Sequence, residues 1–236
     1  LDTLLGLGLD EGGVSSSAVR VQALRCVASI VNGDIRNQER LGSAVVKSAN
    51  QDLPALQAAL RSALHAEEAL ERSAAQELLR CYCTGNPDGQ TILASTIAPS
   101  GGAMGPDGGS SSFGGDLVRA LVGGGSQAHE LEASCRAAAA LSHLLESNSA
   151  CKERILRIPL LVPANDAAPP ELLLPRVVRY INDALHSGES GAPAAAVLLR
   201  LLITWLTDCP PAVAAFLTPA SHIPVVMDIA NGKLGG

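Results

Sequence analysis

One frame of residues recurs four times along this 236-residue chain, and it limits the chain to folds built from repeated units. Each copy has an apolar helical face, then a break rich in Asn, Asp, Gly or Pro, and then a short apolar segment. The segment is marked by Leu41, Leu93, Ile155 and Phe216 in the four copies, which are 52, 62 and 61 residues apart. Apolar residues spaced by three and four predict that these units are helical.

The first copy shows the frame most clearly. Leu24, Val27 and Val31 lie on one helical face, and Asn32-Gly33 then ends the helix, because glycine adopts the left-handed conformation of a C-terminal cap without strain. In the later copies the breaks are Gly85-Asn86-Pro87, Ser147-Asn148 and Asp208-Cys209-Pro210-Pro211. The faces that precede them are Leu79 and Cys83; Ala138, Leu141 and Leu145; and Leu199, Leu202 and Leu206.

A further amphipathic helix is predicted in each unit, over residues 53–64, 116–122 and 175–186, with the start of another at 222–231. The helix over 175–186 begins at a proline, whose missing N–H costs nothing in a first turn. The positions expected to be buried on these helices are Leu53, Leu56, Leu60, Leu64, Val177, Val178, Ile181 and Leu185.

Composition agrees with a helical protein, because the chain has only two Phe, two Tyr and one Trp. Sheet proteins lean on aromatic and β-branched residues, whereas Ala and Leu favour helices. We therefore predict an all-α chain with essentially no strands. Since no unit can bury both faces of its helices alone, the units should stack into a single right-handed α-solenoid over 1–236. Its four repeats would be about 14–66, 67–125, 126–188 and 189–236.

The spacing between copies exceeds the forty-odd residues of common helical repeats, so loops must be inserted. Residues 100–115 are almost entirely Gly, Ser, Ala, Pro and Asp, and we expect a flexible insertion that carries no ligand. A second insertion is expected at 163–170.

Charge and hydropathy exclude several partners. With 17 Lys and Arg against 23 Asp and Glu, the net charge is −6, and no basic cluster compensates it, which disfavours nucleic acid. No apolar stretch reaches the roughly 18–20 residues of a membrane-spanning helix, since Arg200 divides the nearest one, 192–206. The chain has no signal peptide and begins at Leu1, which we interpret as a fragment of a longer cytosolic protein.

No pattern indicates catalysis, a cofactor or a metal, and we predict a protein that is not an enzyme. Cys81-x-Cys83 lacks the spacing of a zinc hairpin and a second pair. Gly114-Gly115-Asp116 has neither the lysine nor the preceding strand of a phosphate-binding loop. The histidines are dispersed, and buried reduced thiols are expected for the cysteines. These residues are His65, His129, His143, His186 and His222, and Cys26, Cys81, Cys83, Cys135, Cys151 and Cys209.

Two groups have more than one interpretation. Tyr180, Trp205 and Phe216 are either partner anchors or core residues, and for Trp205 we favour burial at a helix edge beside Leu202 and Leu206. The charged run 67–72 is expected to be a solvated face, although a basic partner could use it.

Two motifs complete the frame. Both resemble the Leu-Pro-x-Leu element of the armadillo repeat, and they are Asp52-Leu53-Pro54-Ala55-Leu56 and His222-Ile223-Pro224-Val225-Val226.

The second half of the chain shows a more specific resemblance. The segments 131–148 and 151–157, with their Ala-Leu-x-His-x-Leu core, are similar to the globular head of the general vesicular transport factor, a vesicle-tethering golgin. The later segment 199–210, followed by Ala212-Val213 and Phe216-Leu217, also resembles that family.

This resemblance implies a protein-interaction scaffold in ER-to-Golgi and intra-Golgi transport, on the cytosolic face of Golgi membranes. It implies a dimeric head that meets Rab-type GTPases and other tethering complexes, with partner-binding residues unknown. The alternative is another armadillo adaptor outside vesicle tethering. An importin-like protein would need a Trp in every repeat, and the single Trp205 disfavours it.

Overall fold

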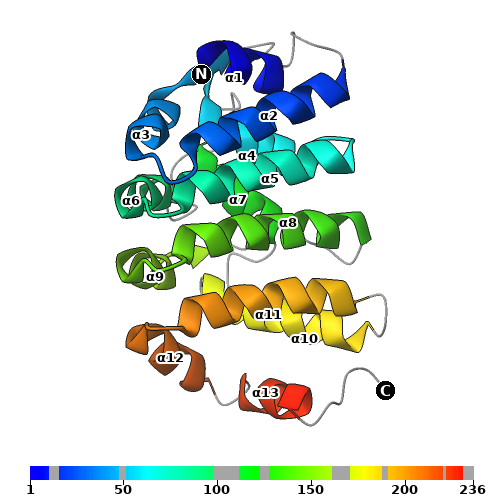
Figure 1. The fold of residues 1–236 in the computed structure, drawn as a ribbon. Helices are drawn as coiled ribbons and strands as arrows, with labels where there is room; N and C mark the ends of the chain where they lie inside the picture. The colour runs from blue at the N-terminus through cyan, green and yellow to red at the C-terminus, as the bar shows by residue number, and fades with distance from the viewer. Residues whose placement is uncertain are drawn as a thin grey trace, which may run out of the picture.

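The computed structural model describes residues 1–10, 16–47, 52–97, 112–122, 128–160, 171–187, 191–219 and 222–230. This part of the chain is mostly helical, as the composition predicts, with thirteen α-helices and four very short strands. The helices follow one another down the molecule from α1 at one end to α13 at the other (Figure 1).

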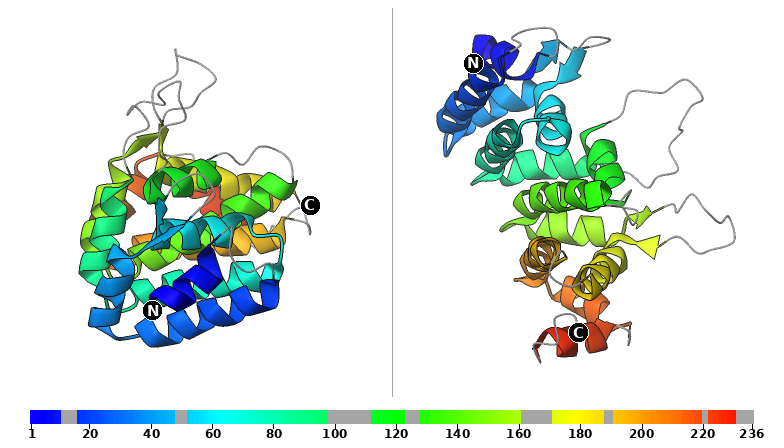
Figure 2. Two further views of the ribbon diagram at one scale, coloured as in Figure 1. Left: turned by 90° about the horizontal axis from the view of Figure 1, so that it is seen from above. Right: turned by 90° about the vertical axis from the view of Figure 1, so that its right-hand side faces the viewer.

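The helices form three columns, each with one member from successive layers of the molecule (Figures 1 and 2). Neighbouring members of the first and second columns contact each other in turn, and in the third column contacts join α1 to α4, α4 to α7 and α10 to α13. The first column has the long helices α2 (Ser17–Val31), α5 (Ala69–Cys83), α8 (Ala128–Leu145) and α11 (Ala192–Leu206). The second has the short helices α3 (Ile35–Ser43), α6 (Pro87–Ser95), α9 (Ser149–Leu156) and α12 (Pro210–Leu217). The third has α1 (Asp2–Leu9), α4 (Ala55–His65), α7 (Phe113–Val122), α10 (Leu173–His186) and α13 (His222–Ala230).

Each long helix ends in the same backbone conformation. Gly33, Gly85, Ser147 and Asp208 all have positive φ, from 51° to 72°, and each lies two residues beyond the last residue of its helix. The break predicted from Asn32-Gly33 is therefore confirmed. It also occurs at Ser147 and Asp208, where an L side chain adopts this conformation only at some energetic cost.

The short helices start from a shared capping pattern. The side chains of Asp34, Asn86 and Asn148 each accept a hydrogen bond from the backbone N–H three residues later, at 2.9–3.1 Å. Such a cap satisfies one of the N–H groups that a helix start leaves without a partner. In the fourth layer Cys209 has this position, and Pro210 and Pro211 follow it, so the first turn has fewer N–H groups to satisfy.

Side chains of the short helices join each layer to the next. The Gln38 amide donates to the backbone oxygens of Cys81 and Thr84, at 2.9 and 3.0 Å. The Gln90 amide donates to those of His143 and Glu146, both at 3.0 Å. We call these contacts the inter-layer amide bonds. They supply partners to carbonyl groups at helix ends that intrahelical hydrogen bonds leave open.

The core runs through all layers, and most predicted positions are buried. Leu24, Leu141 and Leu145 are at most 1% exposed. The fourth layer differs from the prediction, because Leu199 and Leu206 are only partly buried. The buried face of α11 instead consists of Leu198, Leu201, Leu202 and Trp205. Trp205 is the largest side chain of the helix and is fully buried, so Leu199 and Leu206 lie beside this face and not at its centre.

The all-α prediction is confirmed for the described residues, which add only two short antiparallel ribbons to the helices. β1 (Val45–Lys47) pairs antiparallel with β2 (Asp52–Pro54), and β3 (Pro159–Leu160) pairs with β4 (Glu171–Leu172). Both ribbons join a short helix to the third helix of its layer. Leu53, expected on a helix, lies in β2 because Pro54 restricts it to extended conformations, and the helix starts at Ala55.

The expected insertion 100–115 ends earlier than predicted. Ser112 is described, and Phe113, Gly114 and Gly115 form the first turn of α7. Phe113 is buried, at 6% exposure, which provides the apolar contact that the Gly-rich composition concealed. The rest of the expected loop, 100–111, and the second insertion, 163–170, lie outside the described residues.

Candidate functional site

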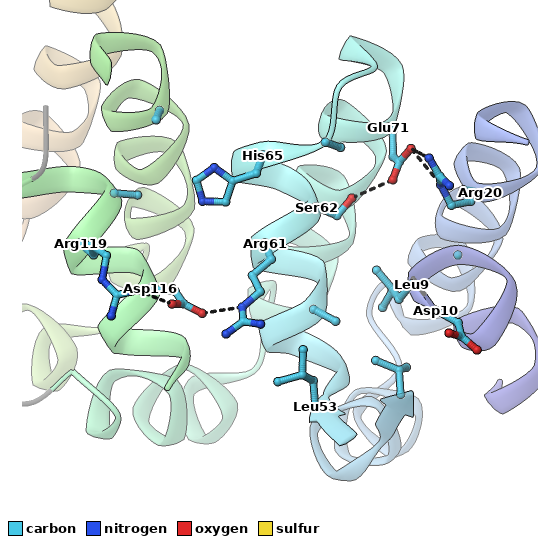
Figure 3. A pocket seen from close by; sticks show the side chains of 16 residues that line it. Leu9, Asp10, Arg20, Leu53, Arg61, Ser62, His65, Glu71, Asp116 and Arg119 are labelled. Carbon is cyan, nitrogen blue, oxygen red and sulfur yellow. Dashed lines mark hydrogen bonds and ion pairs between the residues drawn. The ribbon is translucent and has the colours of Figure 1, made fainter. Parts of the chain in front are cut away.

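A hollow of about 730 Å³ opens on the side of the molecule formed by α1, α4 and α7, and we call it the α1–α4–α7 hollow (Figure 3). Small side chains leave this space. Gly8, Ala58, Ala66, Ala120 and Ala133 line it where larger residues would fill it. Gly8 also lets α1 approach α2 closely, because a Cβ there would lie 3.2 Å from the Leu24 side chain.

One wall of the hollow has a buried carboxylate held by an arginine. Glu71 on α5 accepts two hydrogen bonds from the Arg20 guanidinium of α2, at 2.8 and 3.0 Å, and a weaker one from the Ser62 hydroxyl. The Glu71 side chain is 8% exposed and Arg20 is 29% exposed. A charge-assisted pair with two hydrogen bonds fixes the direction of both groups.

The opposite wall has a second buried carboxylate, between two arginines (Figure 3). Asp116, in the first turn of α7, accepts from the Arg61 Nε and from the Gln57 amide, both at 2.9 Å. Arg119 lies one turn further along α7, with an amino group 3.6 Å from the other Asp116 oxygen. A negative charge in a first turn is also favoured by the helix dipole.

Of the two interpretations of the aromatic residues, the structure favours burial in the core for all three. Trp205 is fully buried and donates its indole N–H to the Lys152 carbonyl at 3.1 Å, so the favoured prediction of burial is confirmed. Phe216 is buried and stacks on His222 with ring centroids 5.3 Å apart. Tyr180 is 9% exposed, below the Arg176 guanidinium.

The cysteines and His143 are held by their helices and form no cluster. All six cysteines are free, and four are buried, but Cys26 is exposed, where a buried thiol was expected. Burial raises the pKa of the Cys81 thiol to about 11, which keeps it protonated. Burial also lowers the pKa of His143. Within the described ranges, no group of three or more His, Cys, Asp or Glu side chains is arranged to hold a metal ion.

The charged run 67–72 was predicted to be a solvated face, but only part of it is exposed to solvent. Glu71 points inward to Arg20, and Arg72 donates to the backbone oxygens of Ala66 and Glu67, at 2.7 and 2.6 Å. No sequence pattern predicted the hollow, because Arg20, Arg61 and Asp116 come from three helices that are distant in sequence. The one available signal was Arg61, a charged residue between the buried Leu60 and Leu64.

Comparison with known proteins assigns most of the chain to one family. The family described as Uso1 / p115 like vesicle tethering protein, head region, matches residues 34–233. Golgin candidate 6 of Arabidopsis thaliana is 35% identical over 242 residues, which cover 98% of this chain and 26% of the relative. General vesicular transport factor p115 of Homo sapiens is 30% identical over 218 residues, which cover 92% of this chain and 21% of the relative.

The chain thus spans about a quarter of the length of these relatives. None of the helices in the described part of the chain combines the length and the apolar composition needed to cross a bilayer. The match over 34–233 and the two relatives agree with the resemblance seen in residues 131–157 and 199–217. The chain belongs to the family of Uso1/p115-like vesicle tethering protein head regions.

Proposed function

We propose that this chain is the protein-interaction scaffold in the head region of a vesicle tether that acts in ER-to-Golgi and intra-Golgi transport. The observation that carries this proposal is the family match over 34–233, together with relatives whose names refer to golgins and vesicular transport. The alternative, an armadillo adaptor outside vesicle tethering, is not favoured by these comparisons. Binding without a chemical step would be enough for a tether.

The fold that we propose for this scaffold is an armadillo-like, right-handed α-solenoid of about four repeats. Its support is the recurrence of the same features in each layer. The left-handed residues Gly33, Gly85, Ser147 and Asp208 recur at the spacings of the sequence frame, and the inter-layer amide bonds of Gln38 and Gln90 repeat its first spacing, 52 residues. A stack of this kind offers a long surface to partners, because each unit contacts only its neighbours.

The partners that we propose are proteins: a Rab-type GTPase, other tethering complexes and a second head in a dimer. The proposed location is the cytosolic face of Golgi membranes, reached through these partners. Support comes from the golgin and vesicular-transport relatives.

Rescue of transport tests the proposal. Cells depleted of the full-length protein receive either the intact protein or a version that lacks residues 1–236, and the arrival of a secretory cargo at the Golgi is timed. The intact protein should restore transport and the shortened one should not. Equal rescue by both would contradict a role for this region in tethering.

A further inference from the structure

We propose that the α1–α4–α7 hollow binds an acidic peptide segment of a partner protein, with its carboxylates on Arg61 and Arg119. This inference rests on the proposed scaffold function and names the chemistry of one partner.

The charges that the hollow presents to solvent are mainly positive. The Glu71 and Asp116 side chains are only 8% and 9% exposed, whereas those of Arg20, Arg61 and Arg119 are 29%, 33% and 64% exposed. The buried carboxylates therefore orient the arginines without covering them. Counted without regard to exposure the lining is neutral, because Asp10, Glu71 and Asp116 balance the three arginines.

The two arginines beside Asp116 are ready to accept another carboxylate. Arg61 uses Nε for Asp116, which leaves its two terminal amino groups without a partner among the described residues. Such a planar pair of N–H donors matches the two oxygens of a carboxylate. Because Asp116 already restrains both guanidinium groups, binding loses less side-chain entropy than with free arginines.

The charge balance favours a carboxylate over a phosphate. Arg61 and Arg119 share Asp116, so this wall has one positive charge in excess, which one carboxylate neutralises. Leu9, Val46 and Leu53 also line the hollow, but each is buried, at 2–7% exposure, so a peptide would be held mainly by polar contacts. Asp10 and His65 also line the hollow, and the Asp10 charge at its edge opposes an acidic ligand.

Fluorescence anisotropy tests the proposal with a labelled peptide of about eight alternating Glu and Ala residues, compared with its Gln–Ala counterpart. The Glu peptide should bind the protein, and its affinity should fall with added salt, because screening reduces the attraction between opposite charges. Arg119→Gln and Arg61→Gln should each weaken it about tenfold, the equivalent of ~1.4 kcal/mol. The control Arg40→Gln removes an exposed arginine paired with Asp2 outside the hollow and should have no effect.

Four results would overturn the proposal: no binding of the Glu peptide, equal binding of the Gln peptide, the same loss with Arg40→Gln, or tighter binding of a phosphoserine peptide or anionic vesicles through the same arginines. If Arg61→Gln unfolds the protein, Arg119→Gln decides, because Arg119 is mostly exposed. Peptide binding in solution does not depend on vesicle transport. A negative result in this assay therefore leaves the result expected in the transport rescue test unchanged.

Discussion

Gln38 and Gln90 make the same contact in consecutive layers: each donates its side-chain amide to two backbone oxygens at the end of the next long helix. Both side chains are buried, at 0% and 4% exposure. Gln90 lies 52 residues after Gln38, which is the spacing between the first two copies of the sequence frame. In the third layer Lys152 occupies it and donates to the Thr207 oxygen at 2.6 Å.

Replacing Gln90 with leucine should destabilise the protein strongly. Leucine fills the space but leaves the His143 and Glu146 oxygens and the Asn148 amide without their Gln90 partner. Buried groups without partners cost about 1–3 kcal/mol each, and we expect a loss of about 2–4 kcal/mol in the free energy of unfolding. Urea denaturation measures it. The exposed Gln22→Leu is the control and should change stability by less than about 0.5 kcal/mol. Equal effects would contradict a role for the inter-layer amide bonds.

Trp205 and Lys152 hold α11 and α9 together in both directions. Trp205 donates to the Lys152 carbonyl, and the Lys152 ammonium donates to the Thr207 carbonyl. Trp205→Phe keeps one aromatic ring but removes the N–H and the volume of the second ring, so stability should fall by about 1–3 kcal/mol. The protein has one Trp, and its native emission should be blue-shifted from that of the unfolded chain because Trp205 is fully buried. Emission at the solvent-exposed wavelength in the native protein would refute this packing.

Two glycine-to-alanine substitutions should have opposite effects. At Gly114, an added Cβ would lie 2.4 Å from backbone atoms of Thr96 and Ile97, so Gly114→Ala should cost about 1–3 kcal/mol. At Gly6, on α1, nothing lies within 4 Å of such a Cβ, and Gly6→Ala should stabilise by about 0.5–1 kcal/mol. Thermal unfolding of both variants compares them. A gain at Gly114 would mean that α7 does not pack on the end of α6.

His143 should make the protein less stable in mild acid. Its pKa is lowered mainly by burial, with further lowering from Arg80 and Arg200 and opposing effects of Glu146 and Glu77. The unfolded chain therefore binds a proton at higher pH than the folded one, and stability falls as pH drops below about 6.5. Urea midpoints at pH 7 and pH 5 should differ less in His143→Gln than in the wild type. The same difference in both proteins would assign the pH effect to other groups.

The sequence predicted the helical frame well because each of its signals is local. The spacing of Leu24, Val27 and Val31 and the cap at Gly33 need no knowledge of neighbouring layers. Phe113 shows where this approach fails. Its neighbours are glycines, which predicted a flexible loop, yet it is buried and starts α7. The contact that decides its conformation is tertiary, since the Gly114 N–H donates to the Thr96 hydroxyl at 2.8 Å.

The hollow could not be predicted, because its charges look like surface residues along the chain. Glu71 lies in a run of acidic residues, and only the arrangement of α2 against α5 places it beside Arg20, 51 residues earlier. Asp116 follows two glycines and was weighed against phosphate binding, whereas its partner is Arg61, 55 residues earlier. Periodicity gives the buried face of a helix but not the residues that a neighbouring helix brings to it.

Vesicle capture in vitro tests the central claim, that this chain is a protein-binding scaffold of a tether. Immobilised Golgi membranes, purified full-length protein and labelled ER-derived vesicles are mixed, and captured vesicles are counted as the isolated chain is added in excess. We predict that the chain lowers capture, because it occupies the head's partner but cannot bridge two membranes. Capture that stays unchanged at saturating chain, and that also persists when the full-length protein lacks residues 1–236, would contradict the account.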